Sequence, residues 1–351
     1  MLGTLLALGL CLGILLWAAD LTARSGARLA TRWGVSSLVI GLTLTSVGTS
    51  LPELATNVAA GMQGTLGDDA SGLALGNVIG SNLALLTLLL GASALVHPIQ
   101  TPQGLVRREG TVLLGLFFVA GLLGADGLLG PYDGALLLTG YASYVALLVR
   151  SEWSRDDAPL PPATEPAPAD EAGDGPPTAW DPAPEPSVMH QPESARPDPE
   201  QPETPSWREP LLVLGGITIV VGSAFGLVHY GTDLATRLGV PEVLIGLGVG
   251  VGTSLPELAV TVRAAKEDAQ LALGNLLGSA IANTGMVLGA GALVHPLIVE
   301  PSALSFDGAF MLAFTVVALL LLGEDRVLAR AEGGVLLVLF ALYTWLRVGS
   351  A

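Results

Sequence analysis

The octapeptide GTSLPELA occurs twice in this chain, as Gly48-Thr49-Ser50-Leu51-Pro52-Glu53-Leu54-Ala55 and again as Gly252-Thr253-Ser254-Leu255-Pro256-Glu257-Leu258-Ala259. Each copy lies within a long apolar stretch. A carboxylate at the centre of a membrane-spanning helix costs about 2.5–3.5 kcal/mol on insertion scales. Because the chain meets this cost twice in the same octapeptide, Glu53 and Glu257 are predicted to have a function that offsets it. A cation bound between the two copies would neutralise both carboxylates.

The composition places these copies in a membrane protein. Of the 351 residues, 51% are hydrophobic and 13% are charged, whereas an ordinary soluble domain carries about 25% charged residues. A helix needs roughly 20 residues to cross a bilayer, and ten apolar runs approach or reach that length. The runs cover residues 1–19, 38–60, 73–96, 111–123, 136–149, 211–228, 243–262, 271–294, 309–322 and 335–346. The sequence therefore predicts an all-α polytopic membrane protein with about ten transmembrane helices.

A proline-rich segment separates the first five runs from the last five. Residues 151–207 hold 15 of the 24 prolines, and 13 Asp and Glu against Arg155 and Arg196, so most of the formal charge of −16 lies here. Such a composition buries too little apolar surface to offset the entropy of ordering. We expect a disordered acidic linker, and its charge indicates no nucleic-acid partner. The predicted domains are a first membrane repeat at 1–150, the linker at 151–207 and a second membrane repeat at 208–351.

Two further segments repeat in the same order in both halves. Gly76-Asn77-Val78-Ile79-Gly80-Ser81 matches Gly274-Asn275-Leu276-Leu277-Gly278-Ser279, and Gly91–Pro98 matches Gly289–Pro296. Each half carries five predicted helices, an odd number, so the second half enters the membrane from the opposite side. This predicts two inverted five-helix repeats with a binding site at the midplane between them.

The basic residues predict the orientation of the chain. With the N-terminus outside, the outer loops hold only Arg237 and Arg347, and the inner loops hold all of the following: Arg24, Arg28, Arg32, Arg107, Arg108, Arg150, Arg155, Arg263, Lys266, Arg326 and Arg330. The positive-inside rule favours this orientation. We therefore expect an integral protein of a bacterial or archaeal-type cell (inner) membrane, with the linker in the cytoplasm. Trp17-Ala18-Ala19 resembles a signal cleavage site, but no basic n-region precedes it. The first repeat needs residues 1–19 as a helix, so we expect them to be retained.

The octapeptide itself has the features of a cation site. Thr49 and Glu53 are four residues apart and share a helix face. Pro52 has no N–H and its ring clashes with the preceding turn, which releases the carbonyls of Gly48 and Thr49 from the helical ladder. Together with Ser50 these groups form an all-oxygen set, which suits hard cations such as calcium or sodium. The second copy supplies an equivalent set from Thr253, Ser254 and Glu257.

The glycine-rich segments are predicted to pack closely beside the octapeptides. Small-xxx-small pairs allow helix backbones to approach each other, and the chain has two of them, Gly76 with Gly80 and Gly274 with Gly278. Ser81 and Ser279 follow and can present hydroxyls to the same cavity. Asn283 lies four residues after Ser279 and so on the same face. His97 and His295 precede prolines at predicted helix ends, and we expect them at the membrane interface rather than in the site.

With these residues in place, the chain resembles the calcium/cation antiporter (CaCA) superfamily, and the sodium/calcium exchangers in particular. The two GTSLPEL segments and the paired GNVIGSN and GNLLGSA segments carry the resemblance, which covers both halves of the chain. It implies ten helices, inverted five-helix repeats and alternating access, in which a gating helix pair slides against a core. It also implies that the transported ions are calcium and sodium, with the proton as the alternative coupling ion. We expect no catalytic residues, no cofactor and a monomeric transport unit.

Carried over position by position, the family's ion ligands fall on nine residues of this sequence: Thr49, Ser50, Glu53 and Ser81 in the first repeat, and Thr253, Ser254, Glu257, Ser279 and Asn283 in the second. Backbone carbonyls near Ser46 and Gly250 would also contribute.

Two positions depart from the exchanger pattern. Leu85 stands four residues beyond Ser81, where the family normally has Asn or Asp, and Asn283 stands where Asp is common. Asn82 points about 100° away from Ser81 on a helix, so we do not expect it to replace the lost donor. The site keeps two carboxylates with a formal charge of −2, which matches one calcium or two sodium ions rather than three sodium ions.

Four hypotheses follow for the function. The first is calcium export driven by sodium, and the second is calcium/proton exchange in the same fold, since two carboxylates held close together favour protonation of one of them. The third is an intramembrane hydrolase that uses Ser50 or Ser254, which would need a base within reach; neither octapeptide contains His or Lys. The fourth is a non-transporting scaffold or sensor, which Leu85 keeps open.

Overall fold

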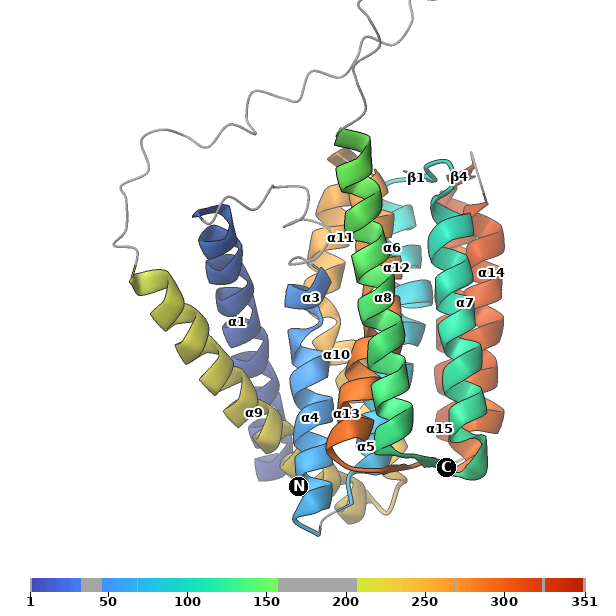
Figure 1. The fold of residues 1–351 in the computed structure, drawn as a ribbon. Coiled ribbons are helices and arrows are strands. Elements are labelled where there is room, and N and C mark those ends of the chain that lie inside the picture. Colours follow the sequence, from blue (N-terminus) through green and yellow to red (C-terminus); the bar gives the residue numbers. More distant parts are fainter. Residues whose placement is uncertain are drawn as a thin grey trace, which may run out of the picture.

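The computed structural model describes residues 2–32, 46–67, 69–156, 207–267, 269–323 and 326–349. Most of these residues are helical, and the helices form a bundle with a common long direction (Figure 1). Within these residues, eight helices are long and apolar enough to cross a membrane. The chain is therefore a polytopic helical membrane protein, as predicted. Of the other two predicted spans, 38–60 begins outside the described residues and 136–149 lies within a long helix, α8.

The first half contains one long helix, one broken helix, one helix with a π-helical insert and a final pair. Its elements are α1 (Leu2–Arg32), α3 (Ser46–Thr49), α4 (Leu51–Thr65), α5 (Ser71–Leu83), the π-helix η2 (Ala84–Leu89), α6 (Leu90–Val96), β1 (Ile99–Gln100), α7 (Leu105–Leu123), the 3-10 turn η3 (Gly124–Asp126), β2 (Leu128–Leu129) and α8 (Pro131–Asp156). Because α8 continues to Asp156, the helix extends six residues past the predicted domain boundary. Most of the predicted linker, residues 157–206, lies outside the described part of the chain.

The second half repeats this succession. Its elements are α9 (Arg208–Leu238), α10 (Glu242–Thr253), α11 (Leu255–Glu267), α12 (Ala269–Ala282), the π-helix η5 (Asn283–Val287), α13 (Leu288–Val294), β3 (Leu297–Ile298), the π-helix η6 (Ala303–Gly308), α14 (Ala309–Leu322), β4 (Val327–Leu328) and α15 (Arg330–Gly349).

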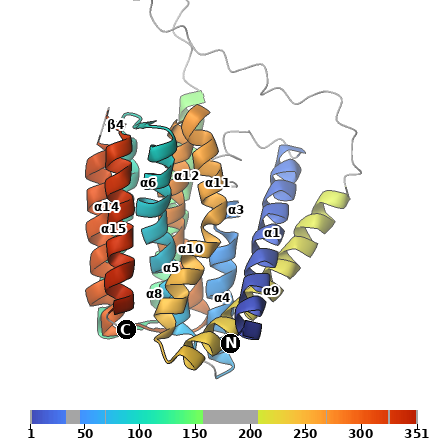
Figure 2. The same cartoon turned by 180° about the vertical axis from the view of Figure 1, so that it is seen from behind.

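Corresponding helices of the two halves run in opposite directions. In Figure 1, α1 starts beside the N label and rises, whereas its counterpart α9 starts at the upper end and descends. Likewise α8 rises, whereas α15 descends to the C label. The reverse view in Figure 2 shows α1 and α9 side by side on one flank and α14 and α15 on the other. Opposite directions of equivalent helices are what inverted repeats require.

The contacts between the halves are reciprocal. Helix α13 packs against α8, and its counterpart α6 packs against α15. Similarly, β1 pairs with β4 and β2 pairs with β3, both antiparallel. Each contact is the image of another under the repeat, so each half supplies part of its partner's packing. The sequence does not predict these strands, because two residues are too few to show a periodic pattern.

Helices α5 and α10 approach each other at backbone distance. A Cβ on Gly76 would lie 2.4 Å from the carbonyl oxygen of Val243, and a Cβ on Gly80 would lie 2.5 Å from that of Leu247. Side chains larger than hydrogen have no room there, so the predicted close packing at this glycine pair is confirmed. At Gly274 the prediction stays untested, because residues 33–45, which hold the equivalents of Val243 and Leu247, lie outside the described part of the chain.

Candidate cation site

Both octapeptides interrupt a helix at the same position. Helix α3 ends at Thr49 and α4 begins at Leu51, while α10 ends at Thr253 and α11 begins at Leu255. In each copy the proline is the second residue of the new helix, where its missing N–H breaks the ladder. The predicted helix breaks are therefore confirmed. They leave the hydroxyl-bearing residues Thr-Ser at the break and the glutamate in the first turn of the next helix.

The Glu53 carboxylate contacts residues from both halves of the chain. Its Oε1 atom lies 3.3 Å from the hydroxyl of Ser81 and 3.0 Å from the hydroxyl of Ser254. Both hydroxyls also lie 3.0 Å from the carbonyl oxygen of Gly250. A hydroxyl has only one proton to donate, so each of the two can serve either Glu53 or Gly250 but not both, and the Oε2 atom of Glu53 has no partner among the described residues. The cluster therefore has more acceptor oxygens than donors, as a cation site needs.

Glu257 completes the pair of carboxylates. Its side chain is fully buried, like that of Glu53. It interacts with the side chain of Thr49 and electrostatically with Glu53. Within the described residues, no well-formed hydrogen bond reaches either of its oxygens. Two buried carboxylates from opposite halves thus interact without a full set of hydrogen-bond donors.

Other polar atoms of the predicted site are buried without a partner among the described residues. They are Oε2 of Glu53, Oγ of Ser50, Oγ of Ser279, and both amide atoms of Asn283. Their side chains are fully buried, and their helices lie together, since α12 packs against α3 and α11 while η5 packs against α4. A buried polar atom without a partner costs about 1–3 kcal/mol. Carboxylate, hydroxyl and carbonyl oxygens are the ligands that calcium and sodium prefer, so the donor set fits a hard cation.

The comparison with known families agrees with this arrangement. The family model described as "Sodium/calcium exchanger protein" matches residues 3–150 and 209–349 of the chain.

The chain belongs to the sodium/calcium exchanger family.

The similarity to individual relatives covers nearly the whole chain. The putative antiporter CaxA of Alkalimonas amylolytica is 32% identical over 342 residues, which cover 96% of each chain. The sodium/calcium exchanger MaX1 of Methanosarcina acetivorans is 32% identical over 358 residues, which cover 93% of each chain. A solved structure of the sodium-calcium exchanger NCX_Mj, soaked with 2.5 mM Na+ and 0.1 mM Ca2+, is 26% identical, with a TM-score of 0.58 and coverage of 97% and 96%. The family is one of transporters, and the resemblance seen in the sequence is confirmed.

Leu85 and its neighbour Asn82 offer no ligand in place of the donor that the family normally has four residues beyond Ser81. Leu85 is fully buried in an apolar cluster and offers no oxygen. The amide of Asn82 donates to the hydroxyl of Thr284 at 3.1 Å and lies 3.9 Å from the sulfur of Met311. Asn82 is thus engaged on another side of its helix from Ser81, as its position on the helix predicts.

Asn77 has a role that the sequence analysis did not assign. Its amide nitrogen donates to the backbone carbonyl of Glu53 at 3.2 Å and to the side chain of Asn57 at 2.7 Å. Its amide oxygen lies 3.4 Å from the hydroxyl of Thr253. Asn77 therefore holds both octapeptides in position. The signal for it was the asparagine repeated in the two GN segments, where Asn275 donates to Thr261 at 3.3 Å.

The histidines lie at helix ends, as predicted. His97 ends α6 and is exposed, and His295 ends α13 in an equally extended backbone conformation.

Proposed function

We propose that this chain is a secondary antiporter that exchanges calcium for sodium across the membrane by alternating access, with the cation held between Glu53 and Glu257. The observation that carries the proposal is the burial of two carboxylates, one from each half, with Glu53 Oε1 lying 3.0 Å from the hydroxyl of Ser254 in the octapeptide that holds Glu257. Like charges at this depth repel each other strongly because little solvent screens them. One calcium ion, or two sodium ions, would remove both the repulsion and the formal charge of −2.

The other proposed ligands are Thr49, Ser50, Ser81, Thr253, Ser254, Ser279 and Asn283, together with the carbonyl oxygen of Gly250. The relatives support the choice of ions, since one is named a sodium/calcium exchanger and the solved structure was soaked with both ions. We propose a monomeric transport unit, because both octapeptides lie in one chain.

The proposed orientation has the N-terminus outside and the linker in the cytoplasm of a bacterial or archaeal-type cell. A relative named inner membrane protein YrbG, from Escherichia coli, supports the location; it is 30% identical over 318 residues, which cover 89% of this chain and 87% of that protein. The helix directions in Figure 1 support the orientation. Arg28 near the end of α1 and Arg107 near the start of α7 lie toward one end of the bundle, and Arg347 near the end of α15 lies toward the other.

We assign the gating role to α1 and α9, which pack along each other. Arg28 Nε lies 3.0 Å from Glu209 Oε1, and the hydroxyl of Thr4 donates to Asp233 Oδ2 at 3.0 Å. The repeat pairs position 28 with 233 and position 4 with 209, so the two contacts are images of each other. They tie α1 to α9 near both ends, which supports movement of the pair as one unit.

Ion dependence of flux in proteoliposomes tests the proposal. We expect calcium uptake when an outward sodium gradient is imposed, and none when choline replaces sodium. Calcium/proton exchange is the second candidate, favoured by Leu85 and Asn283, which reduce the oxygen ligands available to several sodium ions. Calcium uptake driven by a pH gradient in sodium-free buffer, with no response to sodium, would replace the first candidate by the second.

Restoring the missing donor is expected to strengthen cation binding. Leu85→Asn places an amide oxygen four residues beyond Ser81. A hydrogen bond or ligand contact to a charged group contributes about 1.5–3 kcal/mol, from which the cost of desolvating the amide must be deducted. We expect the apparent Kd for calcium to decrease about three- to tenfold, since about 1.4 kcal/mol corresponds to a factor of ten. Calorimetric titration measures this Kd. Leu89→Asn, at a fully buried leucine of the same π-helix, is the control for an amide in the apolar cluster. Equal or weaker binding by a folded Leu85→Asn protein would place position 85 outside the ligand shell.

A further inference from the structure

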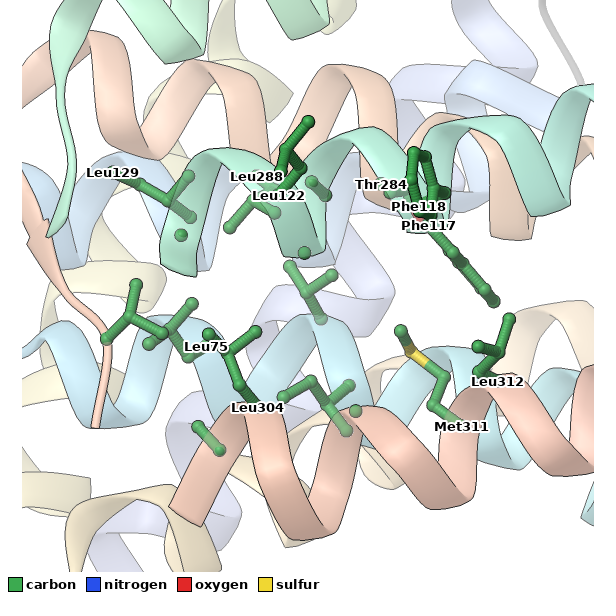
Figure 3. Close-up of a pocket in the computed structure, with 18 of the residues that line it drawn as sticks. Leu75, Phe117, Phe118, Leu122, Leu129, Thr284, Leu288, Leu304, Met311 and Leu312 are labelled. Atoms are coloured by element: carbon green, nitrogen blue, oxygen red, sulfur yellow. The ribbon is translucent and has the colours of Figure 1, made fainter. Parts of the chain in front are cut away.

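A cavity of 440 Å³ lies between α7 and the η6–α14 helix (Figure 3). Its floor is formed by α5, η5 and the start of α13, and its rim carries Phe118, Leu122 and Leu312, which are 70%, 65% and 42% exposed. Asn82 and Thr284 are the only polar side chains among its lining residues, and they bond to each other. The cavity is thus an apolar groove in the part of the molecule that faces lipid.

The repeat explains why this groove exists. The register that pairs Ser81 with Ser279 also pairs Gly121 with Leu319. This leucine is 8% exposed. In the equivalent place of the other half, a leucine side chain therefore occupies the space that a glycine leaves open here.

Two more pairs complete the comparison. Ala303 in the groove corresponds to Leu105, which is 6% exposed. Gly308 in the groove corresponds to Gly110, and a Cβ on Gly110 would lie 3.0 Å from the methyl carbons of Leu319. Leu319 thus fills the space over Gly110, whereas the residue that would do so over Gly308 is Gly121. The groove is encoded by small residues in place of two leucines.

We propose that this groove binds one acyl chain of a phospholipid from the surrounding bilayer. In the other half, leucine side chains fill the equivalent space with hydrocarbon. An acyl chain is also hydrocarbon, so it has the chemistry that fits the groove. Apolar side chains that border empty space lose dispersion contacts. The groove opens on a surface that faces the hydrocarbon of the bilayer. Its lining contains no charged residue, so the chain enters while the headgroup stays at the membrane surface. Asn82 and Thr284 directly follow Ser81 and Asn283, so a bound chain contacts the helices that carry two proposed ligands.

Photolabelling of the full chain tests this site without relying on transport. The protein is reconstituted with phosphatidylcholine that carries a diazirine in one acyl chain, irradiated, and mapped by peptide mass spectrometry. We expect the label to concentrate on residues 117–125 and 303–312. Gly121→Leu, which reproduces the position of Leu319, should reduce this labelling at least fivefold. Among the residues that the structure describes, no atom lies within 4 Å of a Cβ at Gly121. The first carbon of the new leucine side chain therefore has room.

The control is Gly115→Leu on the same helix, which also has open space at its Cβ but does not line the groove. It should label like the unchanged protein. Ala303→Leu, which reproduces the position of Leu105, serves as a second groove-filling variant if Gly121→Leu does not fold. Label spread evenly over all lipid-facing helices, or equal labelling of folded groove-filling variants and Gly115→Leu, would overturn the proposal.

Discussion

Calcium flux is expected to fall about a hundredfold or more when Glu257 is replaced by glutamine. Removing one partner of a buried charge pair costs about 2–5 kcal/mol, and the cation here would lose one of its two carboxylates. Glutamine preserves the size of the side chain, so the loss would come from charge rather than from shape. The measurement is sodium-driven uptake of radioactive calcium into proteoliposomes.

The stability of the Glu257→Gln protein separates loss of binding from loss of folding. In calcium-free buffer the variant no longer has two carboxylates repelling each other, so we expect its melting temperature to equal or exceed that of the unchanged protein. Glu300→Gln is the matched control, because Glu300 is exposed, and its flux should be unchanged. Normal flux in Glu257→Gln would remove the carboxylate pair from the mechanism.

The second large effect is expected where α10 meets α5. A Cβ on Gly246 would lie 2.5 Å from the carbonyl oxygen of Leu73 and 2.9 Å from the Cα of Gly76. Gly246→Val therefore forces two backbones apart, and overpacking of a fitted interface commonly costs about 1–3 kcal/mol. Because backbone atoms cannot rotate away as a side chain can, we expect a loss near or above the upper value. Thermal unfolding of the purified protein in detergent measures it.

Gly248 provides a control two residues away on the same helix. Among the described residues, no atom lies within 4 Å of a Cβ added there, so Gly248→Val introduces the same side chain into the same helix without the clash. Its melting temperature should stay close to that of the unchanged protein. Similar melting temperatures for both variants would show that the close approach of α5 and α10 does not contribute to stability.

The sequence predicts the features of this exchanger that arise from local chemistry. Proline cannot continue the helical ladder, so the breaks before Glu53 and Glu257 could be placed from the octapeptides alone. Long apolar runs predicted most of the membrane-spanning helices, and the repeated motifs predicted halves that run in opposite directions.

Features that depend on contacts between the halves were not predictable in this way. The π-helices η2 and η5 contain Leu85 and Asn283, and such turns often occur at functional sites, but no residue type in them signals an extra residue per turn. The hydrogen bonds of Asn77 depend on partners from two other helices.

The crossed contacts α13–α8 and α6–α15, together with the pairings β1–β4 and β2–β3, mean that neither half is a self-sufficient folding unit. Each half leaves a helix whose packing partner belongs to the other. A polypeptide consisting of one half alone would meet the same need by associating with a second copy in the opposite orientation. The architecture is therefore that of an antiparallel homodimer whose two subunits have become joined head to tail, and after joining, each was free to acquire residues such as Leu85 that the other lacks.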